Sequence, residues 1–450
     1  MTTKHYHFIG IGGIGISAIA RYYKQLGYTV SGSTDSDSEL IRNLRKEGMD
    51  IALGHRAENI PAYTDRIIYT KAVFGTANTF EEGYRNNVEM VAGMERKIPL
   101  TAYPDALAEI VNAKKCIAIT GSHGKSTTTA MTGVMLAGSA AGGSVLVGTQ
   151  VPQLDGSNIH IENSPYFAIE ACEYKRAFLA YRPYITVITN IELDHLDYYH
   201  DLADYISAFQ SLIDQTSGYV VYDMEDQNAQ KLDFTRTVAK PVRVNLDGFF
   251  DIEGNFHTFP PMDLQVPGDH LLFDAKLAFT VGKLVGLDDA YIQKKLESYA
   301  GCWRRSEIIR TTEHGNILMS DYGHHPTEIR LTLVAIKNKY PTKKLFVAFQ
   351  PHQHSRTREL LEEFSVCFDA ADELMIPDIY FSRDSDEDVR YMTIERFIDT
   401  LRVRYPFVRN GNGLRNTLAS IKEYDGENPD SSIIVLLGAG DIDTLREEIR

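Results

Sequence analysis

Apolar and polar positions along the first hundred residues follow two periods, one typical of strands and one typical of helices. Apolar runs at 6–11 and 29–33 have the length of buried strands, and each precedes a helical pattern, at 16–26 and 39–47. Strands that alternate with helices in this way are typical of βαβ units on a parallel sheet. The N-terminal part of the chain is therefore predicted to be an α/β domain.

The same alternation returns twice farther along the chain. A β-branched run at 116–120 leads through a glycine-bearing turn into a predicted helix at 125–136. Later strands are expected at 317–320, 344–349, 373–376 and 433–437. The segment 245–262, rich in Gly, Phe and Pro, has no clear period and is expected to be a surface excursion. The pattern therefore predicts an α/β fold along the whole chain.

Length then sets the number of domains. The 450 residues exceed what one hydrophobic core usually holds, so about three domains are expected. Two prolines between 98 and 104 suggest one connection, and a second junction is expected near the pair Arg304–Arg305. We predict domains at 1–103, 104–309 and 310–450.

Composition narrows the class of protein. A net charge of -15 argues against a general nucleic-acid binder, because phosphate backbones are held by clustered Lys and Arg. No apolar stretch reaches the roughly 18 to 20 residues that cross a bilayer, so we expect neither a signal peptide nor a membrane anchor. The cysteines are far apart and are predicted to be buried free thiols in a reducing cytoplasm. They are Cys116, Cys172, Cys302 and Cys367.

The segment 120–127 carries the strongest chemical signal. It reads Thr-Gly-Ser-His-Gly-Lys-Ser-Thr between a predicted strand and a predicted helix. Amides in such a turn cradle phosphates, while Lys125 would neutralise the outer phosphates and Ser126 would ligate magnesium. The loop is shorter than the general phosphate-loop pattern, so a glycine turn with a solvated lysine is the alternative. The predicted nucleotide contacts are Gly121, Ser122, His123, Gly124, Lys125, Ser126 and Thr127.

A second glycine turn, Gly-Ile-Gly-Gly-Ile-Gly at 10–15, also lies between a strand and a helix. Its glycines permit a tight turn and the close approach of a diphosphate, and Asp35 follows about twenty residues later. NAD, FAD and a UDP-sugar would all suit this turn. The predicted diphosphate contacts are Gly10, Gly12, Gly13, Ile14, Gly15 and Asp35.

Polar residues follow two further predicted strands. Glu170 and Glu173 come after one of them, and Asn190, Glu192 and His195 come after the next. They would collect at the carboxyl edge of the sheet, beside the phosphate loop. Carboxylate oxygens and a neutral imidazole can ligate magnesium when substrate phosphates complete the shell. Acidic helix starts stabilised by the helix dipole are the alternative.

Histidines and arginines gather in two segments of the third domain, 321–328 and 350–358, each after a predicted strand. They suggest recognition of an anion or proton handling, with an exposed polar loop as the alternative. The spacing is poor for tetrahedral zinc. The pair Arg304–Arg305 is either a solvated face or a phosphate clamp at the domain junction.

Taken in order, these motifs resemble those of the Mur ligase family. The likeness runs from about Tyr6 to Asp443 and ends on Gly-Ala-Gly-Asp-Ile at 438–442. It implies a Rossmann-like N-terminal domain for a UDP-sugar, a central P-loop ATPase-type α/β domain and a C-terminal Rossmann-like α/β domain. It also implies that the first glycine turn holds uridine diphosphate and not a dinucleotide.

The resemblance further implies an ATP-dependent ligase of peptidoglycan precursor synthesis. ATP would phosphorylate the carboxylate of UDP-N-acetylmuramate, and the amine of L-alanine would attack the acyl phosphate. Two Mg2+ ions are expected, in a cytoplasmic monomer or weak homodimer.

Roles follow from the resemblance by position. Lys125 would stabilise the transferring phosphoryl group, Ser126 and Glu170 would bind one Mg2+, and His195 would bind the second. Family positions near ATP correspond to Asn190 and to Arg304 or Arg305, and the resemblance does not decide between the two arginines. Positions near the substrate and the amino acid correspond to Tyr322, His324, His352 and Arg356. The residues expected to be catalytic are Lys125, His195, His324 and Arg356.

Several positions depart from the family pattern. Thr34 stands where Asp is usual, although the next residue is Asp. Leu271 and Asp274 replace two asparagines near the adenosine, and Gln353 replaces an arginine. The segment 201–214 has no lysine, whereas other members carbamylate one there. That absence is expected of the alanine-adding type.

Three alternatives remain open from the sequence. One is a ligase that recycles a whole tripeptide onto UDP-N-acetylmuramate, although Thr-Asn-Ile at 189–191 favours the alanine-adding type. Another, an NAD-dependent oxidoreductase, explains the first glycine turn and leaves Lys125 unexplained. The third is a nucleotide-sensing regulator without turnover.

Overall fold

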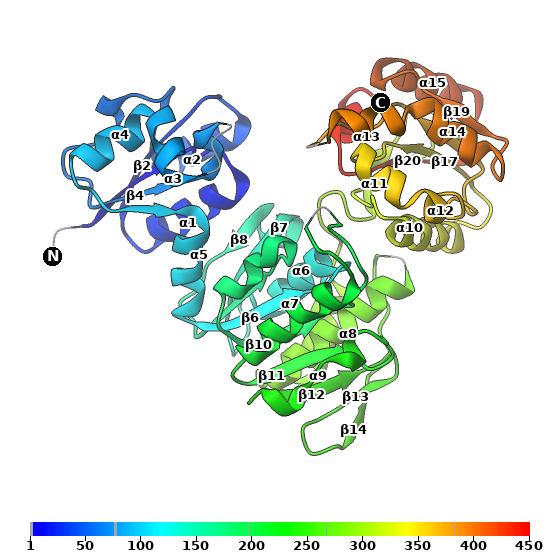
Figure 1. Cartoon of the computed structure of the whole chain (residues 1–450). Helices are drawn as coiled ribbons and strands as arrows, with labels where there is room; N and C mark the ends of the chain where they lie inside the picture. The colour runs from blue at the N-terminus through cyan, green and yellow to red at the C-terminus, as the bar shows by residue number, and fades with distance from the viewer. Residues whose placement is uncertain (1–2, 76–78, 197, 267, 383) are drawn as a thin grey trace.

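The chain forms three α/β units, each built on its own β-sheet. The computed structural model describes residues 3–75, 79–196, 198–266, 268–382 and 384–450. Figure 1 shows the N-terminal unit in blue and the C-terminal unit in yellow to red, apart from each other, with the central unit in cyan and green joining them. The predicted three-domain α/β architecture is confirmed.

The N-terminal sheet is parallel, with strand order β3-β2-β1-β4-β5. Its strands are β1 (His5–Ile9), β2 (Thr29–Thr34), β3 (Asp50–Leu53), β4 (Arg66–Tyr69) and β5 (Leu100–Ala102). Its helices are α1 (Ile14–Gln25), α2 (Glu39–Lys46), α3 (Phe80–Gly83), α4 (Val88–Glu95) and α5 (Tyr103–Asn112), with 3-10 turns η1 (Ala57–Asn59), η2 (Lys71–Phe74) and η3 (Tyr84–Asn86). The glycine turn therefore lies between β1 and α1, at the carboxyl edge of this sheet.

The central sheet has nine strands in the order β14-β13-β12-β11-β10-β6-β9-β7-β8. They are β6 (Lys115–Thr120), β7 (Ser144–Val151), β8 (Ser157–His160), β9 (Tyr166–Glu170), β10 (Pro183–Ile188), β11 (Tyr219–Asp223), β12 (Lys240–Val244), β13 (Gly248–Phe250) and β14 (Phe256–Thr258). The helices and 3-10 turns are α6 (Lys125–Leu136), η4 (Pro152–Leu154), η5 (Tyr174–Ala180), α7 (Leu202–Asp214), η6 (Ala229–Lys231), η7 (Phe234–Arg236), α8 (Asp269–Leu284) and α9 (Asp289–Glu297). Strand β6 lies between β10 and β9, both parallel to it, so the phosphate loop that follows β6 stands in the middle of the carboxyl edge.

The C-terminal sheet has the order β15-β16-β20-β17-β18-β19, and only β15 runs antiparallel to its neighbour. The strands are β15 (Glu307–Thr311), β16 (Ile317–Asp321), β17 (Lys344–Phe349), β18 (Glu373–Ile376), β19 (Val408–Asn410) and β20 (Ser432–Leu437). The helices are α10 (Pro326–Lys339), α11 (His354–Glu359), α12 (Leu361–Phe364), α13 (Asp386–Tyr391), α14 (Ile394–Arg402) and α15 (Leu414–Glu427), with the 3-10 turn η8 (Asp441–Glu447). A capping box of His325 and Glu328, with Pro326 at the first position, begins α10 beside the central unit.

The hydrophobic cores join two of the three units. One buried cluster runs from the N-terminal unit into the central unit, where Tyr22 of α1 meets Phe167 of β9 with ring centroids 6.3 Å apart. The C-terminal unit has two clusters of its own, one on each face of its sheet. The N-terminal and central units are therefore packed as one body, whereas the C-terminal unit has a separate core.

Two expectations from the sequence were wrong. The segment 245–262 is not a plain surface excursion, because β13 and β14 extend the central sheet there as an antiparallel hairpin. Cys172 is exposed, while Cys116, Cys302 and Cys367 are buried free thiols as expected. No helix among the described residues is long and apolar enough to cross a membrane.

Candidate active site

The phosphate loop spans the four residues between β6 and α6. Gly121 and Gly124 have positive φ angles of 134° and 81°, which residues with side chains rarely adopt. A Cβ on Gly124 would come within 2.5 Å of Asp274, and one on Gly121 would collide with Thr189. Asn190 holds the loop from the side, since its Oδ1 accepts from the backbone N–H of His123 at 3.0 Å. Both glycines are therefore required by the local geometry.

Lys125, the first residue of α6, turns its ammonium back over the loop. Its Nζ donates to the carbonyl oxygens of Gly121 and Ser122 and to Oε1 of Glu173, at 2.5, 3.0 and 3.1 Å. Burial opposes the charge, but Glu173, Cys172 and Glu170 together outweigh burial and raise the pKa of Lys125. The loop therefore holds a permanent cation at its centre.

Ser126 and Glu170 form a pair of oxygen donors beside this lysine. The Ser126 hydroxyl donates to Oε1 of Glu170 at 3.0 Å, and the backbone N–H of Gly148 donates to Oε2 at 2.8 Å. From the C-terminal side of the junction, Arg305 brings Nη2 within 3.4 Å of the Ser126 hydroxyl. The predicted magnesium ligands Ser126 and Glu170 are thus in contact.

His195 contacts the carboxylate of Glu173, whereas Ser126 contacts that of Glu170. Its Nε2 is 3.2 Å from Oε1 of Glu173, while Glu173 Oε2 is buried without a hydrogen-bond partner among the described residues. Burial would raise the pKa of Glu173, but Lys125 and His195 outweigh it and lower this pKa. The charged carboxylate therefore contacts both Lys125 and His195 through Oε1, while its second oxygen has no hydrogen-bond partner among the described residues.

The C-terminal unit places its polar residues opposite this edge. Arg356 donates from Nη2 to Oδ1 of Asp194 at 3.0 Å, across the boundary between the two units. Burial, together with the charge of Arg356, lowers the pKa of His324 to about 3, so this imidazole is neutral at pH 7. The rings of His324 and His352 are 6.0 Å apart, and Tyr322 meets His324 at 5.4 Å.

The two junction arginines have different surroundings. Arg304 donates to the carbonyl oxygens of Gly438 and Gly440 in the glycine turn after β20. Arg305 instead lines a cavity of about 270 Å3 beside the phosphate loop. Both apolar and charged residues line this phosphate-loop cavity. Its lining includes Leu271, Phe273, Asp274, Arg305, Glu328 and Leu331.

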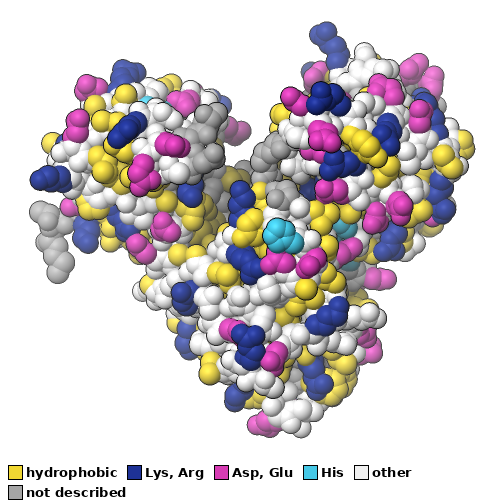
Figure 2. Space-filling view, in the orientation of Figure 1, with side chains coloured by type: hydrophobic (Ala, Val, Ile, Leu, Met, Phe, Trp, Pro, Cys, Tyr) yellow, Lys and Arg dark blue, Asp and Glu magenta, His cyan; other side chains and the backbone are white. Residues whose placement is uncertain are grey.

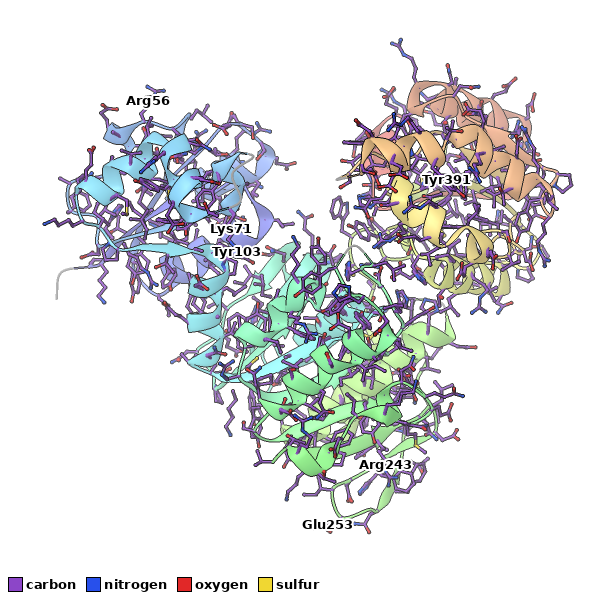
Figure 3. The ribbon with its side chains drawn as sticks, viewed as in Figure 1. Arg56, Lys71, Tyr103, Arg243, Glu253 and Tyr391 are labelled. Atoms are coloured by element: carbon purple, nitrogen blue, oxygen red, sulfur yellow. The ribbon has the colours of Figure 1, made fainter. Side chains whose placement is uncertain are left out.

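A second cavity reaches Glu170 from the N-terminal unit. The glycine-turn cavity, of about 320 Å3, lies between the N-terminal and central units, and Ile14, Gly15, Tyr103 and Glu170 are among its lining residues. Figure 3 labels Tyr103 where the blue unit meets the central one. Gly15 packs against this ring so closely that a Cβ would collide with it. The cavity therefore connects the first glycine turn with the carboxylate beside Ser126.

The glycine turn itself is built on buried backbone contacts. Gly10 has a φ of 78°, and the N–H groups of Gly10 and Ile11 both donate to the carbonyl oxygen of Ser33, at 2.9 and 3.0 Å. Gly13 caps α1. Asp35 is largely exposed just beyond β2, with Oδ1 3.4 Å from Nε2 of His55. These predicted residues therefore share the carboxyl edge of the N-terminal sheet.

Two polar clusters of the structure were not predicted from the sequence. In the N-terminal unit Glu89 accepts hydrogen bonds from Ser33, His55 and Asn59. At the phosphate loop, His123 lies between Glu192 and Glu328, at 3.1 and 3.0 Å. A histidine inside a phosphate loop was the available signal for the second cluster.

The fold and the site together define a class of α/β protein with three units and a lysine-bearing phosphate loop. One cavity lies beside this loop, and a second cavity leads from the other glycine turn to Glu170. Figure 2 shows a hollow between the two upper units, above the central one. Such an arrangement suits an enzyme that brings a nucleoside triphosphate to a second, diphosphate-bearing substrate.

Comparisons with known proteins agree with this class. Family models match as the Mur ligase family catalytic domain at 5–115, the Mur ligase middle domain at 119–248 and the Mur ligase glutamate ligase domain at 304–440. A UDP-N-acetylmuramate–L-alanine ligase of Clostridium botulinum is 36% identical over 98% of this chain and 96% of its own. One from Alkaliphilus metalliredigens is 33% identical over 98% and 95%.

The solved structures include a UDP-N-acetylmuramate-alanine ligase from Thermotoga maritima, with a TM-score of 0.76 and 25% identity over 99% of this chain and 98% of that one. A murein peptide ligase from Psychrobacter arcticus has the same fold, with a TM-score of 0.66 at 18% identity over 99% and 98%. The chain belongs to the Mur ligase family.

Proposed function

We propose that the protein is an ATP-dependent ligase that joins L-alanine to the carboxylate of UDP-N-acetylmuramate. The observation that carries this proposal is the place of Glu170, which lines the glycine-turn cavity and contacts Ser126 of the phosphate loop at 3.0 Å. A carboxylate that enters from the glycine turn would meet the outer phosphate of ATP at this point. Relatives aligned along 98% of the chain support the choice of substrates.

ATP is proposed to bind with its phosphates on the loop and its adenosine in the phosphate-loop cavity. The proposed phosphate contacts are residues 121–127, which form the loop and the start of α6, together with Asn190, which hydrogen-bonds to the loop. Lys125 offers the cation for the transferring phosphoryl group. Of the junction arginines, we assign the ATP contact to Arg305, because it lines the cavity, whereas Arg304 is engaged by the turn after β20.

The side chains beside the phosphate loop offer oxygen atoms that are suitable ligands for Mg2+. Ser126 and Glu170 offer adjacent oxygens, and the unpartnered Oε2 of Glu173 lies in the carboxylate that meets His195. Oxygen-rich sets of this kind suit Mg2+ when substrate phosphates complete the shell. When bound, Mg2+ neutralises charge on the phosphates and the substrate carboxylate. We therefore propose one ion at Ser126 and Glu170 and a second at His195.

The chemistry would proceed in two steps. A carboxylate oxygen of UDP-N-acetylmuramate attacks the γ-phosphorus of ATP, which gives the acyl phosphate and ADP. The L-alanine amine then attacks the acyl carbon, phosphate leaves and one proton is lost. We propose that Tyr322, His324, His352 and Arg356 surround the amino acid. The neutral His324 can accept a hydrogen bond from the amine, and Arg356 can pair with the alanine carboxylate.

The UDP group is proposed to lie on the first glycine turn. Its contacts would be Gly10, Gly12, Gly13, Ile14, Gly15 and Asp35. The turn presents a helix N-terminus to the diphosphate, and the adjoining cavity leads toward Glu170. We also propose domain boundaries near 103/104 and 309/310, with the second placed just before β15, because all of Glu307–Thr311 belongs to the C-terminal sheet. We propose a cytoplasmic monomer or weak homodimer, and sedimentation at several concentrations would test the oligomeric state.

The decisive experiment is phosphate release from ATP with UDP-N-acetylmuramate and one of L-alanine, L-serine, glycine or the tripeptide. Turnover fastest with L-alanine is expected. Turnover with the tripeptide alone would favour the recycling ligase. A nicotinamide-dependent absorbance change would instead favour an oxidoreductase, and ATP binding without phosphate release would favour a regulator.

A further inference from the structure

His123, Glu192 and His325 form a cluster that brings together three separate motifs. Each offers one ligand atom, and these atoms lie within 4.8 Å of one another. His123 belongs to the phosphate loop, Glu192 follows β10, and His325 caps α10 of the C-terminal unit. Within the described ranges, this is the one group of three or more His, Cys, Asp or Glu side chains spaced in this way.

Each member of the cluster is oriented by a second partner on its far side. Nδ1 of His123 is 3.0 Å from Oε1 of Glu328, which leaves Nε2 facing Oε2 of Glu192 at 3.1 Å. Thr327 donates from Oγ1 to the other oxygen of Glu192 at 2.9 Å, and from its backbone N–H to Nδ1 of His325 at 3.3 Å. Ligands of protein-bound metals are commonly fixed by outer hydrogen bonds of this kind, above all a carboxylate on the second ring nitrogen of a histidine.

We propose that His123, Glu192 and His325 bind a transition-metal ion of the zinc class. Two imidazole nitrogens and one carboxylate oxygen suit Zn2+, Co2+ or Ni2+ and are a poor match for Mg2+, which prefers oxygen. In a tetrahedral site, ligand atoms lie roughly 3.4 Å apart, so closing around the ion requires side-chain shifts of about an ångström. The rings of His123 and His325, already 4.8 Å apart between centroids, can make that shift by small rotations.

The site differs from the proposed magnesium sites in residues and in ligand chemistry. None of Ser126, Glu170 and His195 belongs to it. Its fourth position faces the phosphate-loop cavity, because His123 and Glu192 both line that cavity. A water molecule or a phosphate oxygen could complete the shell there.

The ion would connect two units of the molecule. Two ligands come from the central unit and the third from the N-cap of α10, so metal binding joins the phosphate loop to the C-terminal unit. A ligand that bridges two folded units stabilises the joined state. Zn2+ should therefore raise the Tm of the protein.

The test is a titration of the full-length protein with Co2+ in saturating Mg2+ and without ATP or substrate. One equivalent should bind and give the intense visible absorption of four-coordinate Co2+, and Zn2+ should displace it. The variant His325→Asn keeps an acceptor at the cap of α10, so the helix start is preserved. It should lose the visible band, and Glu192→Gln should bind Co2+ at least tenfold more weakly.

The control is His257→Ala, which removes an exposed imidazole that pairs with Asp251 at 2.7 Å on the β14 hairpin. It should bind Co2+ as the wild type does. The absence of a visible band in the wild type, or an unchanged band in His325→Asn, would overturn the proposal and leave the cluster as a hydrogen-bonded contact without metal. Neither result depends on ligase turnover, so failure here and failure of the proposed function can be told apart.

Discussion

Arg304 and Arg305 are adjacent in sequence, yet their guanidinium groups serve different parts of the molecule. Both lie 5.0 Å from the centre of the Tyr322 ring. Arg304 then points to the carbonyl oxygens of the turn after β20, and Arg305 points to Ser126 and the phosphate-loop cavity. Arg304 has a left-handed backbone φ of 57°, and its side chain therefore points away from that of Arg305.

Alanine substitution should separate the two arginines. Arg305→Ala is expected to lower kcat/KM for ATP at least tenfold, or about 1.4 kcal/mol, with little change in Tm. Arg304→Ala is expected to lower the free energy of unfolding by about 1 to 3 kcal/mol, because buried carbonyl oxygens lose their donor. Steady-state kinetics and urea unfolding of both variants provide the measurement. Equal effects of the two changes on KM would contradict the assignment.

Lys125 is expected to be the most sensitive residue of the loop. Lys125→Ala should lower kcat by at least a hundredfold, because charge stabilisation at such a site is worth roughly 3 kcal/mol or more. Phosphate release with all substrates present measures this loss. Lys231→Ala, at an exposed lysine paired with Asn228, serves as the control and should keep wild-type turnover. Near-normal release from Lys125→Ala would exclude the proposed role.

Asp274 should make stability depend on pH. Burial raises the pKa of this carboxyl to about 8, from 3.8 in the unfolded chain. The folded state therefore keeps a proton that the unfolded state loses, so stability falls as pH rises from about 4 to about 8, by up to about 4 kcal/mol at pH 7.

Asp274→Asn keeps an acceptor for Thr128, whose hydroxyl donates to Asp274 at 3.0 Å, and removes the titration. Its gain in Tm over the wild type should grow between pH 5 and pH 8. Calorimetry at several pH values provides the test. Parallel Tm profiles of the two proteins would show that Asp274 titrates normally.

At the scale of elements, Glu89 joins three segments of the N-terminal unit. From α4 it accepts hydrogen bonds from Ser33 in β2, from Asn59 in η1 and from His55 between β3 and η1. Burial would raise the pKa of Glu89, but these donors outweigh it and lower the pKa far below its ordinary value. The charged carboxylate therefore fixes the segment that carries His55 beside Asp35.

Glu89→Gln should destabilise the N-terminal unit by about 2 to 4 kcal/mol, because buried donors lose a charged acceptor. It should also weaken binding of UDP-N-acetylmuramate more than binding of ATP. Urea unfolding and calorimetric titration measure the two effects. Glu423→Gln, at an exposed position of α15, is the control. A variant of wild-type stability would contradict this view of the cluster.

The elements with a strong period were predicted closely. The expected helix 125–136 and strand 344–349 coincide with α6 and β17. Glycines at 124 and 138 flank the helix, and prolines at 341 and 351 flank the strand, so the bounds of both could be predicted from the sequence. The hairpin of β13 and β14 was missed, since its stability comes from ring contacts such as Phe250 with Phe256, at 4.9 Å, and not from a local period.

The sequence predicted which site residues lie together only where each motif directly follows a strand of one parallel sheet. Parallel strands bring Thr120 and Thr189 to one edge, so the loop and its neighbours could be placed together. The contact between His123 and Glu328 joins residues 205 positions apart in two units. Nothing in either motif specifies the packing of those units, and this contact therefore required the structure.

At the scale of the whole molecule, the single tryptophan stands at the junction of the central and C-terminal units. Trp303 donates its backbone N–H to Gln150 at 3.0 Å and packs beside Arg304 and Arg446. If the C-terminal unit moves when nucleotide binds, the surroundings of this indole must change. A non-hydrolysable ATP analogue is therefore expected to shift its fluorescence.

Fluorescence titration with the analogue measures this movement. Trp303→Phe should remove the signal while tyrosine emission remains. Arg305→Ala should move the same spectral change to a higher analogue concentration. An unchanged spectrum at an analogue concentration that saturates calorimetric binding would contradict movement at this junction.

The hydrophobic core shared by the N-terminal and central units has a consequence for folding during synthesis. The cluster that joins Tyr22 to Phe167 lies wholly within the first 240 residues, and the C-terminal clusters begin only after residue 317. During synthesis, the first two units can bury their common core before the third has left the ribosome. The second core cluster of the central unit extends to Cys302, so a released chain that ends just before β15 should already resist protease. The C-terminal unit should then fold onto two units that are already folded.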